Sequence, residues 1–175
     1  MPTITISGAP GSGTTTVAKL LKEKLGIKHV YAGEIFRKEA VKRGMSLQEF
    51  GKYCEKNPEI DKKLDEFQKE ILERGNVILE GRLSGWIAYS NRIPALKVYL
   101  WADEETRVKR IMKREGGKYE EKKREMIERE TSEIERYKKL YGIDIRDTSF
   151  YDLIIDTSSK TPEEIAEIIL SKVVK

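Results

Sequence analysis

The chain has 175 residues, of which 37% are charged and 38% are hydrophobic, and its formal net charge is +4. This length favours one compact domain, and no apolar run approaches the roughly 18 residues that a membrane-spanning helix needs. One cysteine and one histidine exclude both a disulfide framework and a Cys/His zinc site. The residues after Met1 lack the basic and apolar segments of a signal peptide, so we expect a cytoplasmic protein without a membrane partner.

Five short segments have the composition of buried strands. The first, residues 3–7, alternates β-branched residues and is followed by a glycine-rich turn and by apolar residues at helical spacing. The other predicted strands comprise residues 28–31, 77–80, 96–101 and 153–156. Helical stretches separate each strand from the next, which predicts an α/β fold with a parallel sheet covered by helices.

The last predicted helix has a complete N-terminal signal. Thr161 is the expected cap, Pro162 occupies the first turn, and Glu164 follows three residues after the cap. Apolar residues then recur on one face at Ile165, Ile168, Ile169 and Val173. We expect this face to cover the sheet.

Two stretches do not fit the sheet. Residues 33–74 contain no strong strand, and their two or three predicted helices are broken near residues 44–46 and 57–58, which indicates a helical insertion. Residues 113–141 are dominated by Lys, Arg and Glu. This second segment is predicted to be either a mobile helical lid or an exposed charged helix.

The glycine-rich turn has the context of a phosphate-binding loop, because it follows a strand and opens a helix. Its glycines allow backbone N–H groups to point at an anion, and the helix adds the positive end of its dipole. Thr15 occupies the position of a Mg²⁺-binding hydroxyl, whereas Thr14 stands where the standard pattern has a lysine. The residues predicted to bind ATP or its phosphates here are Gly8, Ala9, Pro10, Gly11, Ser12, Gly13, Thr14, Thr15 and Thr16.

Two other interpretations of this loop are a plain turn and a decayed loop that binds a nucleotide without catalysis. The interpretation as a decayed loop holds only if the rest of the sequence lacks catalytic cations, because phosphoryl transfer depends on neutralising the charge of the phosphates. This sequence has such cations: Arg110 and Arg114 share one helical face. Another helical face carries Arg129, Glu133 and Arg136. Taken alone, each set is also compatible with a salt-bridged helix surface.

In this order the motifs resemble those of nucleoside monophosphate kinases, and most closely those of archaeal-type cytidylate kinases. The resemblance covers essentially the whole length, through residues 8–15, 31–37, 79–82, 110–114 and 128–136. It implies a P-loop NTPase fold whose five-stranded parallel sheet has the order 2-3-1-4-5. The implied single domain has a core at residues 1–32, 76–112 and 142–175, a helical acceptor-binding lobe at about 33–75 and a helical lid at about 113–141.

The resemblance also implies roles for individual residues. Arg110 covers the donor adenine, and Arg114 reaches the donor phosphates. Arg129 and Arg136 fold over the transferring phosphoryl group, so the implied catalytic residues are Arg114, Arg129 and Arg136. Arg37 grips the acceptor phosphate. The residues implied at the acceptor are Gly33, Phe36, Arg37, Glu80, Gly81, Arg82 and, near the ribose, Glu133.

Three departures from the bacterial pattern concern the acceptor and the loop. Ala32 replaces a serine that touches the acceptor, Leu83 replaces an aspartate, and Thr14 replaces the loop lysine. The bacterial insert that completes base recognition has no counterpart in this shorter chain. Asp61 and Asp65, within the helical insertion, are the candidates to take its place.

The implied reaction is the Mg²⁺-dependent, in-line transfer of a phosphoryl group from ATP to CMP or dCMP. It requires no general base, because the acceptor phosphate is already an anion. Alternative acceptors are AMP, UMP, shikimate and dephospho-coenzyme A. A different alternative is a non-catalytic regulator that holds RNA with its basic lid, although no aromatic-studded basic sheet accompanies that lid. We therefore expect no nucleic-acid partner. We also expect the protein to be a monomer.

Overall fold

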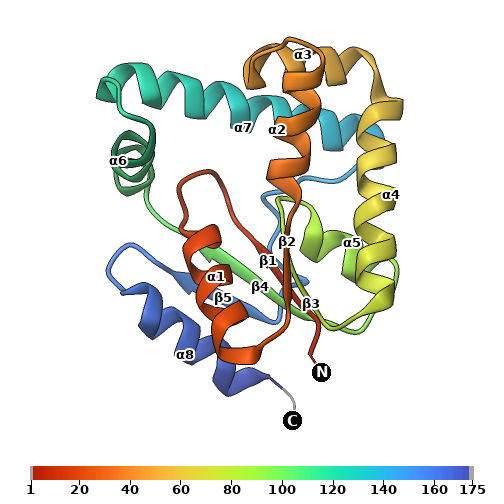
Figure 1. Cartoon of the computed structure of the whole chain (residues 1–175). Coiled ribbons are helices and arrows are strands. Elements are labelled where there is room, and N and C mark those ends of the chain that lie inside the picture. Colours follow the sequence, from red (N-terminus) through yellow and green to blue (C-terminus); the bar gives the residue numbers. More distant parts are fainter. Residues whose placement is uncertain (1, 174–175) are drawn as a thin grey trace.

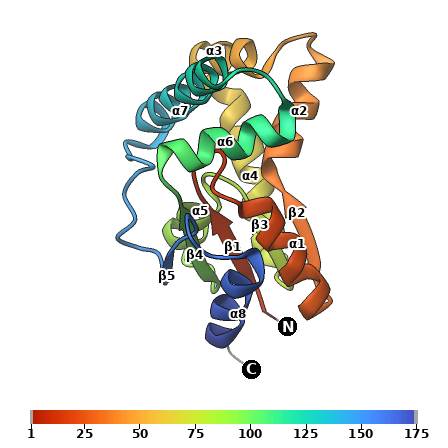
Figure 2. The ribbon, with the colours of Figure 1, turned by 90° about the vertical axis from the view of Figure 1, so that its left-hand side faces the viewer.

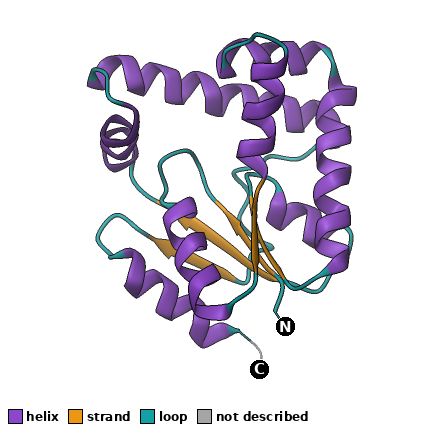
Figure 3. Ribbon diagram, viewed as in Figure 1, coloured by secondary structure: helices purple, strands orange, loops and turns teal. Residues whose placement is uncertain are grey.

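A five-stranded sheet forms the centre of the protein in the computed structural model, which describes residues 2–173 (Figure 1; Figure 3). Met1, Val174 and Lys175, which fall in the predicted core segments, lie outside the described residues. The strands are β1 (Ile4–Ser7), β2 (Lys28–Tyr31), β3 (Val77–Glu80), β4 (Leu96–Trp101) and β5 (Leu153–Asp156). All are parallel and lie in the order β2-β3-β1-β4-β5, which confirms the predicted fold class and strand order.

The central strand β1 is buried on both faces. Successive side chains of a strand alternate between faces, so Ile4 and Ile6 face one layer of helices while Thr5 and Ser7 face the other. All four are at most 1% exposed. Ser7 Oγ accepts a hydrogen bond from the backbone N–H of Gly85 at 3.2 Å. This burial fixes the level at which β1 ends and the following loop begins.

One face of the sheet is covered by α1 (Thr14–Leu25) and α8 (Pro162–Lys172), which pack against each other (Figure 2). Their apolar side chains join those of the strands in one cluster, which includes Ile4, Ile6, Val17, Leu21, Ile78, Val98, Leu100, Ile165 and Ile169. The predicted start of α8 is confirmed: Thr161 Oγ1 accepts from the backbone N–H of Glu164 at 3.1 Å, and the Glu164 carboxylate accepts from that of Thr161 at 3.5 Å.

The other face is covered by α4 (Pro58–Arg74), α5 (Ser84–Ser90) and the second half of α7 (Tyr119–Tyr141). Their shared core contains Leu72, Leu79, Leu83, Ile87, Ala88, Tyr137 and Ile145. The predicted helical insertion consists of α2 (Ala32–Lys42), α3 (Leu47–Lys56) and α4 and contains no strand. Gly44, with φ of +66°, and Pro58, at the first turn of α4, separate these helices.

Helix α7 lies across the molecule from α6 (Glu104–Glu115) to α4 (Figure 1). Its first half packs on α6 through Met126. One face of the second half is buried, with Arg136 and Glu133 inside and Tyr137 in the core, while Glu135, Lys138 and Lys139 are exposed. The lid over residues 113–141 stays a prediction. Within the described residues, no helix is long and apolar enough to cross a membrane.

Candidate active site

The loop of residues 8–13 joins β1 to α1 at the carboxyl edge of the sheet, where open α/β sheets bind ligands. Gly11 and Gly13 have φ values of +82° and +86°, which favour glycine. A Cβ atom on Gly11 would lie 2.6 Å from the carbonyl oxygen of Arg107 in α6. Gly13 caps α1 without a side-chain hydrogen bond, and the first turn of α1 has no acidic residue. The N–H groups of that turn are thus available to an anion.

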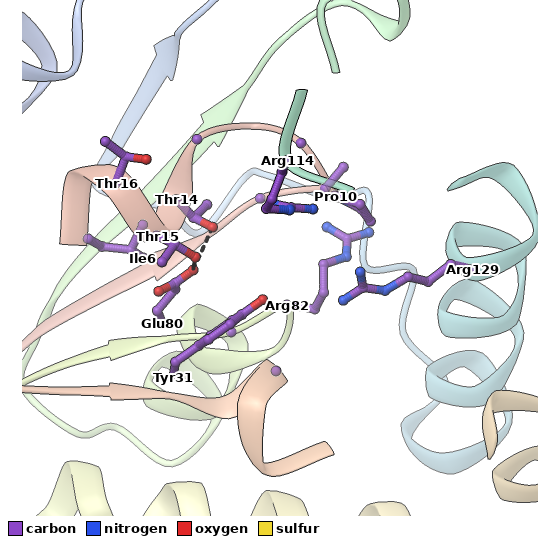
Figure 4. A pocket seen from close by; sticks show the side chains of 16 residues that line it. Ile6, Pro10, Thr14, Thr15, Thr16, Tyr31, Glu80, Arg82, Arg114 and Arg129 are labelled. Carbon is purple, nitrogen blue, oxygen red and sulfur yellow. Dashed lines mark hydrogen bonds between the residues drawn. The ribbon is translucent and has the colours of Figure 1, made fainter. Parts of the chain in front are cut away.

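Glu80, at the end of β3, contacts the first residues of α1. Its Oε2 accepts hydrogen bonds from Thr14 Oγ1 at 2.8 Å and from Thr15 Oγ1 at 2.5 Å (Figure 4). Its Oε1 lies 2.9 Å from His29 Nε2. A buried carboxylate needs such donors, and these residues supply them. The contacts of Glu80 are thus with the first turn of α1 and with β2, and it lines the loop cavity beside Gly81 and Arg82. The place of Glu80 at the acceptor stays a prediction.

Three arginines from separate elements line the same cavity as the loop: Arg82 after β3, Arg114 in α6 and Arg129 in α7. Figure 4 places the guanidinium groups of Arg82 and Arg129 across the cavity from Thr15 and Glu80. Arg114 is half exposed, and its Nη2 lies 3.2 Å from Glu115 Oε2. Among the described residues, these arginines surround the position that lacks the lysine at Thr14.

Two further arginines of α6 hold the loop from outside. Arg110 Nη1 donates to the carbonyl oxygen of Gly11 at 3.2 Å and to Thr157 Oγ1 at 2.9 Å. Arg107 Nη1 donates to the carbonyl oxygen of Pro10 at 3.4 Å and pairs with Glu130 of α7. Burial lowers the pKa of Arg110. Helix α6 thus links the loop to α7.

A buried ion-pair cluster joins the cavity wall to α7. Glu133 Oε2 accepts from Arg82 Nε at 2.6 Å, and Glu133 Oε1 lies 3.4 Å from Arg129 Nε. Burial opposes the charge on Glu133, but Arg82 and Arg129 outweigh that effect and lower its pKa. Burial likewise opposes the charge on Arg82, yet Glu133 raises its pKa. Arg82 Nη1 is buried and has no partner among the described residues, so a donor is free for an anion.

A second cavity, the acceptor cavity, lies between α2, α4 and α7 and shares Gly33, Arg82 and Arg129 with the loop cavity. It is also lined by Ala32, Phe36, Asp61, Leu64, Asp65, Gln68, Leu83, Glu133, Arg136 and Tyr137. Four predicted acceptor residues, Gly33, Phe36, Arg82 and Glu133, therefore meet in one place. Gly81 lines the loop cavity.

Two predicted arginines lie elsewhere than expected. Arg136 Nε donates to Asp61 Oδ2 at 2.9 Å, and its guanidinium carbon lies 5.1 Å from the centre of the Phe36 ring. Burial raises the pKa of Asp61, and Arg136 opposes that rise. Arg136 is thus in the wall of the acceptor cavity and not over the loop, because Asp61 requires a cation in the interior. Arg37 is not among the residues lining either cavity, and its Nε is buried without a partner among the described residues.

A third cavity continues the loop cavity toward α8, with which it shares Gly11, Gly13, Thr16 and Arg114. Its other walls include Arg110, Lys113, Thr157 and Lys160. The loop therefore lies between two cavities, one on the α8 side and one on the α4 side. The two cavities are thus candidate sites for two ligands that meet at the loop.

The oxygens beside the loop suit a magnesium ion. Thr15 Oγ1 and Glu80 Oε2 are 2.5 Å apart, and Mg²⁺ is usually held by one or two carboxylates together with waters and substrate phosphates. The described residues contain no group of three or more His, Cys, Asp or Glu side chains able to hold a metal ion by themselves. The donor set therefore fits an ion that arrives with a phosphorylated substrate.

Residues 3–159 match the cytidylate kinase-like family. The chain belongs to this family. The curated cytidylate kinases of Archaeoglobus fulgidus and Methanocaldococcus jannaschii are 51% and 49% identical to it, each over 171 residues. Both matches cover 97% of this chain, and they cover 93% and 96% of the two relatives. The resemblance to archaeal-type cytidylate kinases is thereby confirmed.

The shikimate kinase of Acinetobacter baumannii, solved in complex with shikimate, has a similar fold. It superposes with a TM-score of 0.60 at 18% identity, covering 98% of this chain and 92% of that one. At this identity the likeness concerns the fold, which is that of P-loop kinases.

Three residues that contact the site were not predicted from the sequence. Arg107 is three residues before Arg110 and seven before Arg114, so helical spacing was available to find it. Gln68 continues the spacing of Asp61 and Asp65 along α4 and is buried with them. His29 gave no signal, because its contact with Glu80 depends on the pairing of β2 with β3.

Asp65 lies in the interior of the protein and is only 6% exposed. Burial raises its pKa from 3.8 to about 7, although the hydrogen bond from Tyr141 and the charge of Arg136 lower it and Asp61 raises it. Folding stability should therefore fall as the pH rises between these values, by up to about 1.4 kcal/mol per unit. Asp65→Asn should abolish most of this dependence and be more stable than the wild type at pH 8.

Urea unfolding at pH 5 and pH 8 measures this effect. Asp144→Asn is the matched control, because the pKa of Asp144 is lowered to about 2 by Arg146 and its charge is constant over this range. An equal pH dependence in the wild type and Asp65→Asn would show that Asp65 is ionised throughout.

Proposed function

We propose that the chain transfers the γ-phosphoryl group of ATP to CMP or dCMP. The observation that carries the proposal is that the loop cavity and the acceptor cavity meet at Arg82 and Arg129. A transferred phosphoryl group must lie between donor and acceptor, and both arginines face that position. Identity of about 50% to curated cytidylate kinases over almost the whole chain supports the choice of acceptor.

The donor triphosphate binds along the loop, with backbone N–H groups of the loop and of the first turn of α1 as its hydrogen-bond donors. Its nucleoside occupies the cavity on the α8 side, beside Arg110. Arg110 and Arg107 keep the loop in shape by holding its carbonyl oxygens. Arg114 adds positive charge at the donor phosphates.

Thr15 and Glu80 would hold magnesium together with the phosphates, and the ion would neutralise charge on the donor. The chain's own arginines supply the remaining positive charge. This assignment accounts for Thr14: its hydroxyl binds Glu80, while the cationic function of the missing lysine belongs to Arg82, Arg114 and Arg129.

The acceptor phosphate binds Arg82, whose buried Nη1 has no partner among the described residues, and Arg37 joins it when the lobe closes on the acceptor. Glu133 orients Arg82 and Arg129 by binding both. No residue needs to remove a proton, because the acceptor phosphate oxygen is already an anion at neutral pH. Catalysis therefore consists of alignment and charge neutralisation.

A panel of acceptors tests the proposal. With ATP and Mg²⁺, CMP and dCMP should be phosphorylated far faster than AMP, UMP, shikimate or dephospho-coenzyme A. Each product is measured directly by chromatography, so that slow ATP hydrolysis is not counted. Preference for any other acceptor on the panel, or ATP turnover that no acceptor stimulates, would contradict the proposed function.

The lid residue Arg129 should affect turnover more than binding. Arg129→Ala should lower kcat for CMP by at least about 100-fold, because the charge it supplies is needed most in the transition state. The KM values for ATP and CMP should change much less. Steady-state kinetics with both substrates varied measures these effects, and Arg124→Ala, an exposed position of the same helix, is the control. A rise in KM for CMP at unchanged kcat would make Arg129 a binding residue only.

A further inference from the structure

Helix α4 presents three buried polar side chains to the acceptor cavity. Asp61, Asp65 and Gln68 are at most 7% exposed, and their spacing of four and three residues places them on one helical face. Helix faces in protein interiors are normally apolar, because buried polar groups require partners. A polar row beside a cavity therefore indicates polar contacts with what enters it.

The contacts within the protein leave part of this row free. Asp61 is committed to Arg136 at 2.9 Å. Asp65 uses Oδ2 to accept from the Tyr141 hydroxyl at 2.7 Å, and Gln68 uses Oε1 to accept from the Ser84 hydroxyl at 3.2 Å. No hydrogen bond among the described residues engages Asp65 Oδ1 or Gln68 Nε2. Asp61 Oδ1 is also without a hydrogen bond there, but the charge of Asp61 is paired with Arg136. The row thus offers one carboxylate without an ionic partner among the described residues, at Asp65, and one donor three residues along the helix.

These two free groups match one edge of cytosine. Cytosine carries an amino group at C4, which donates, and a carbonyl oxygen O2, which accepts. Uracil keeps O2 but has the acceptor O4 in place of the amino group, as thymine does. A carboxylate oxygen therefore attracts the amino group of cytosine and repels O4 of uracil.

We propose that Asp65 is the residue that selects cytosine, accepting a hydrogen bond from its amino group through Oδ1, while Gln68 donates to O2 through Nε2. Tyr141 and Ser84 are the positioning residues, because Tyr141 donates to the second oxygen of Asp65 and Ser84 donates to the amide oxygen of Gln68. Phe36, which also lines the cavity, supplies an aromatic wall for the ring. The inference rests on the proposed use of this cavity by the acceptor base.

Burial favours a discriminating role for Asp65. Leaving a buried acceptor without a hydrogen bond costs much more binding free energy than leaving a solvent-exposed one unpaired. A base that cannot donate at this point is therefore rejected. The raised pKa of Asp65 has the same origin, since few groups in the cavity compensate its charge. An amino group bound to Oδ1 would supply the missing compensation.

The test compares binding and turnover of CMP and UMP. Asp65→Asn keeps the shape of the side chain but can present an N–H group, so it should lower the CMP-to-UMP ratio of kcat/KM by about 10- to 100-fold. Calorimetric titration of each monophosphate without ATP should give the same loss of selectivity. Glu66→Gln, the exposed neighbour on α4, should retain the wild-type ratio.

A second variant separates the two contacts. Gln68→Glu still accepts from Ser84 but loses the donor toward O2, which cytosine and uracil share, so it should weaken both nucleotides about equally. Unchanged CMP-to-UMP selectivity in folded Asp65→Asn would overturn the inference, as would a loss confined to CMP in Gln68→Glu. If the wild type selects CMP in titration but phosphorylates no acceptor, the proposed function fails and the base assignment stands.

Discussion

The contacts of Glu80 are the constraint on which the site depends. This carboxylate is 1% exposed at the end of β3, and an unpaired charge there would be very unfavourable. Its partners come from β2, through His29, and from the first turn of α1, through Thr14 and Thr15. The pairing of β2, β3 and β1 therefore determines where α1 begins. Because the loop of residues 8–13 connects β1 to α1, Glu80 also fixes the opening that faces the phosphates.

The remaining charge around that opening comes from α6, from α7 and from Arg82, which lies between β3 and α5. Helix α6 holds the loop from outside through Arg107 and Arg110, while Arg82 and Arg129 converge on Glu133 at the junction of the two cavities. A lysine within the loop supplies one charge on a flexible stem, whereas arginines provide planar groups suited to phosphate oxygens. Thr14 is thus compatible with a catalytic loop, because its surroundings provide the cations.

Local patterns predicted the parts of this molecule that depend on neighbours in sequence. Four of the five strands begin and end at the predicted residues. The capping contacts between Thr161 and Glu164 and the glycine-rich loop before α1 also lie where the sequence predicts them. The errors concern pairing across the fold. The charges of α7 were predicted to lie on a mobile lid or on an exposed helix, whereas Arg136 is buried and paired with Asp61, 75 residues away in the chain. The contact between His29 and Glu80 likewise depends on strand pairing, which no local pattern encodes. The roles of Arg37, Arg114 and Arg129 stay predictions until substrates are measured.

The two loop threonines provide the most direct test of this account. Both donate to Glu80 Oε2, so Thr14→Ala and Thr15→Ala each remove one hydrogen-bond donor to this oxygen. Only Thr15 is assigned to magnesium. ATP binding to each variant is titrated calorimetrically with and without Mg²⁺. Mg²⁺ should strengthen ATP binding to Thr14→Ala nearly as much as to the wild type, whereas Thr15→Ala should lose at least about tenfold of this strengthening. Equal losses in the two variants would contradict this assignment.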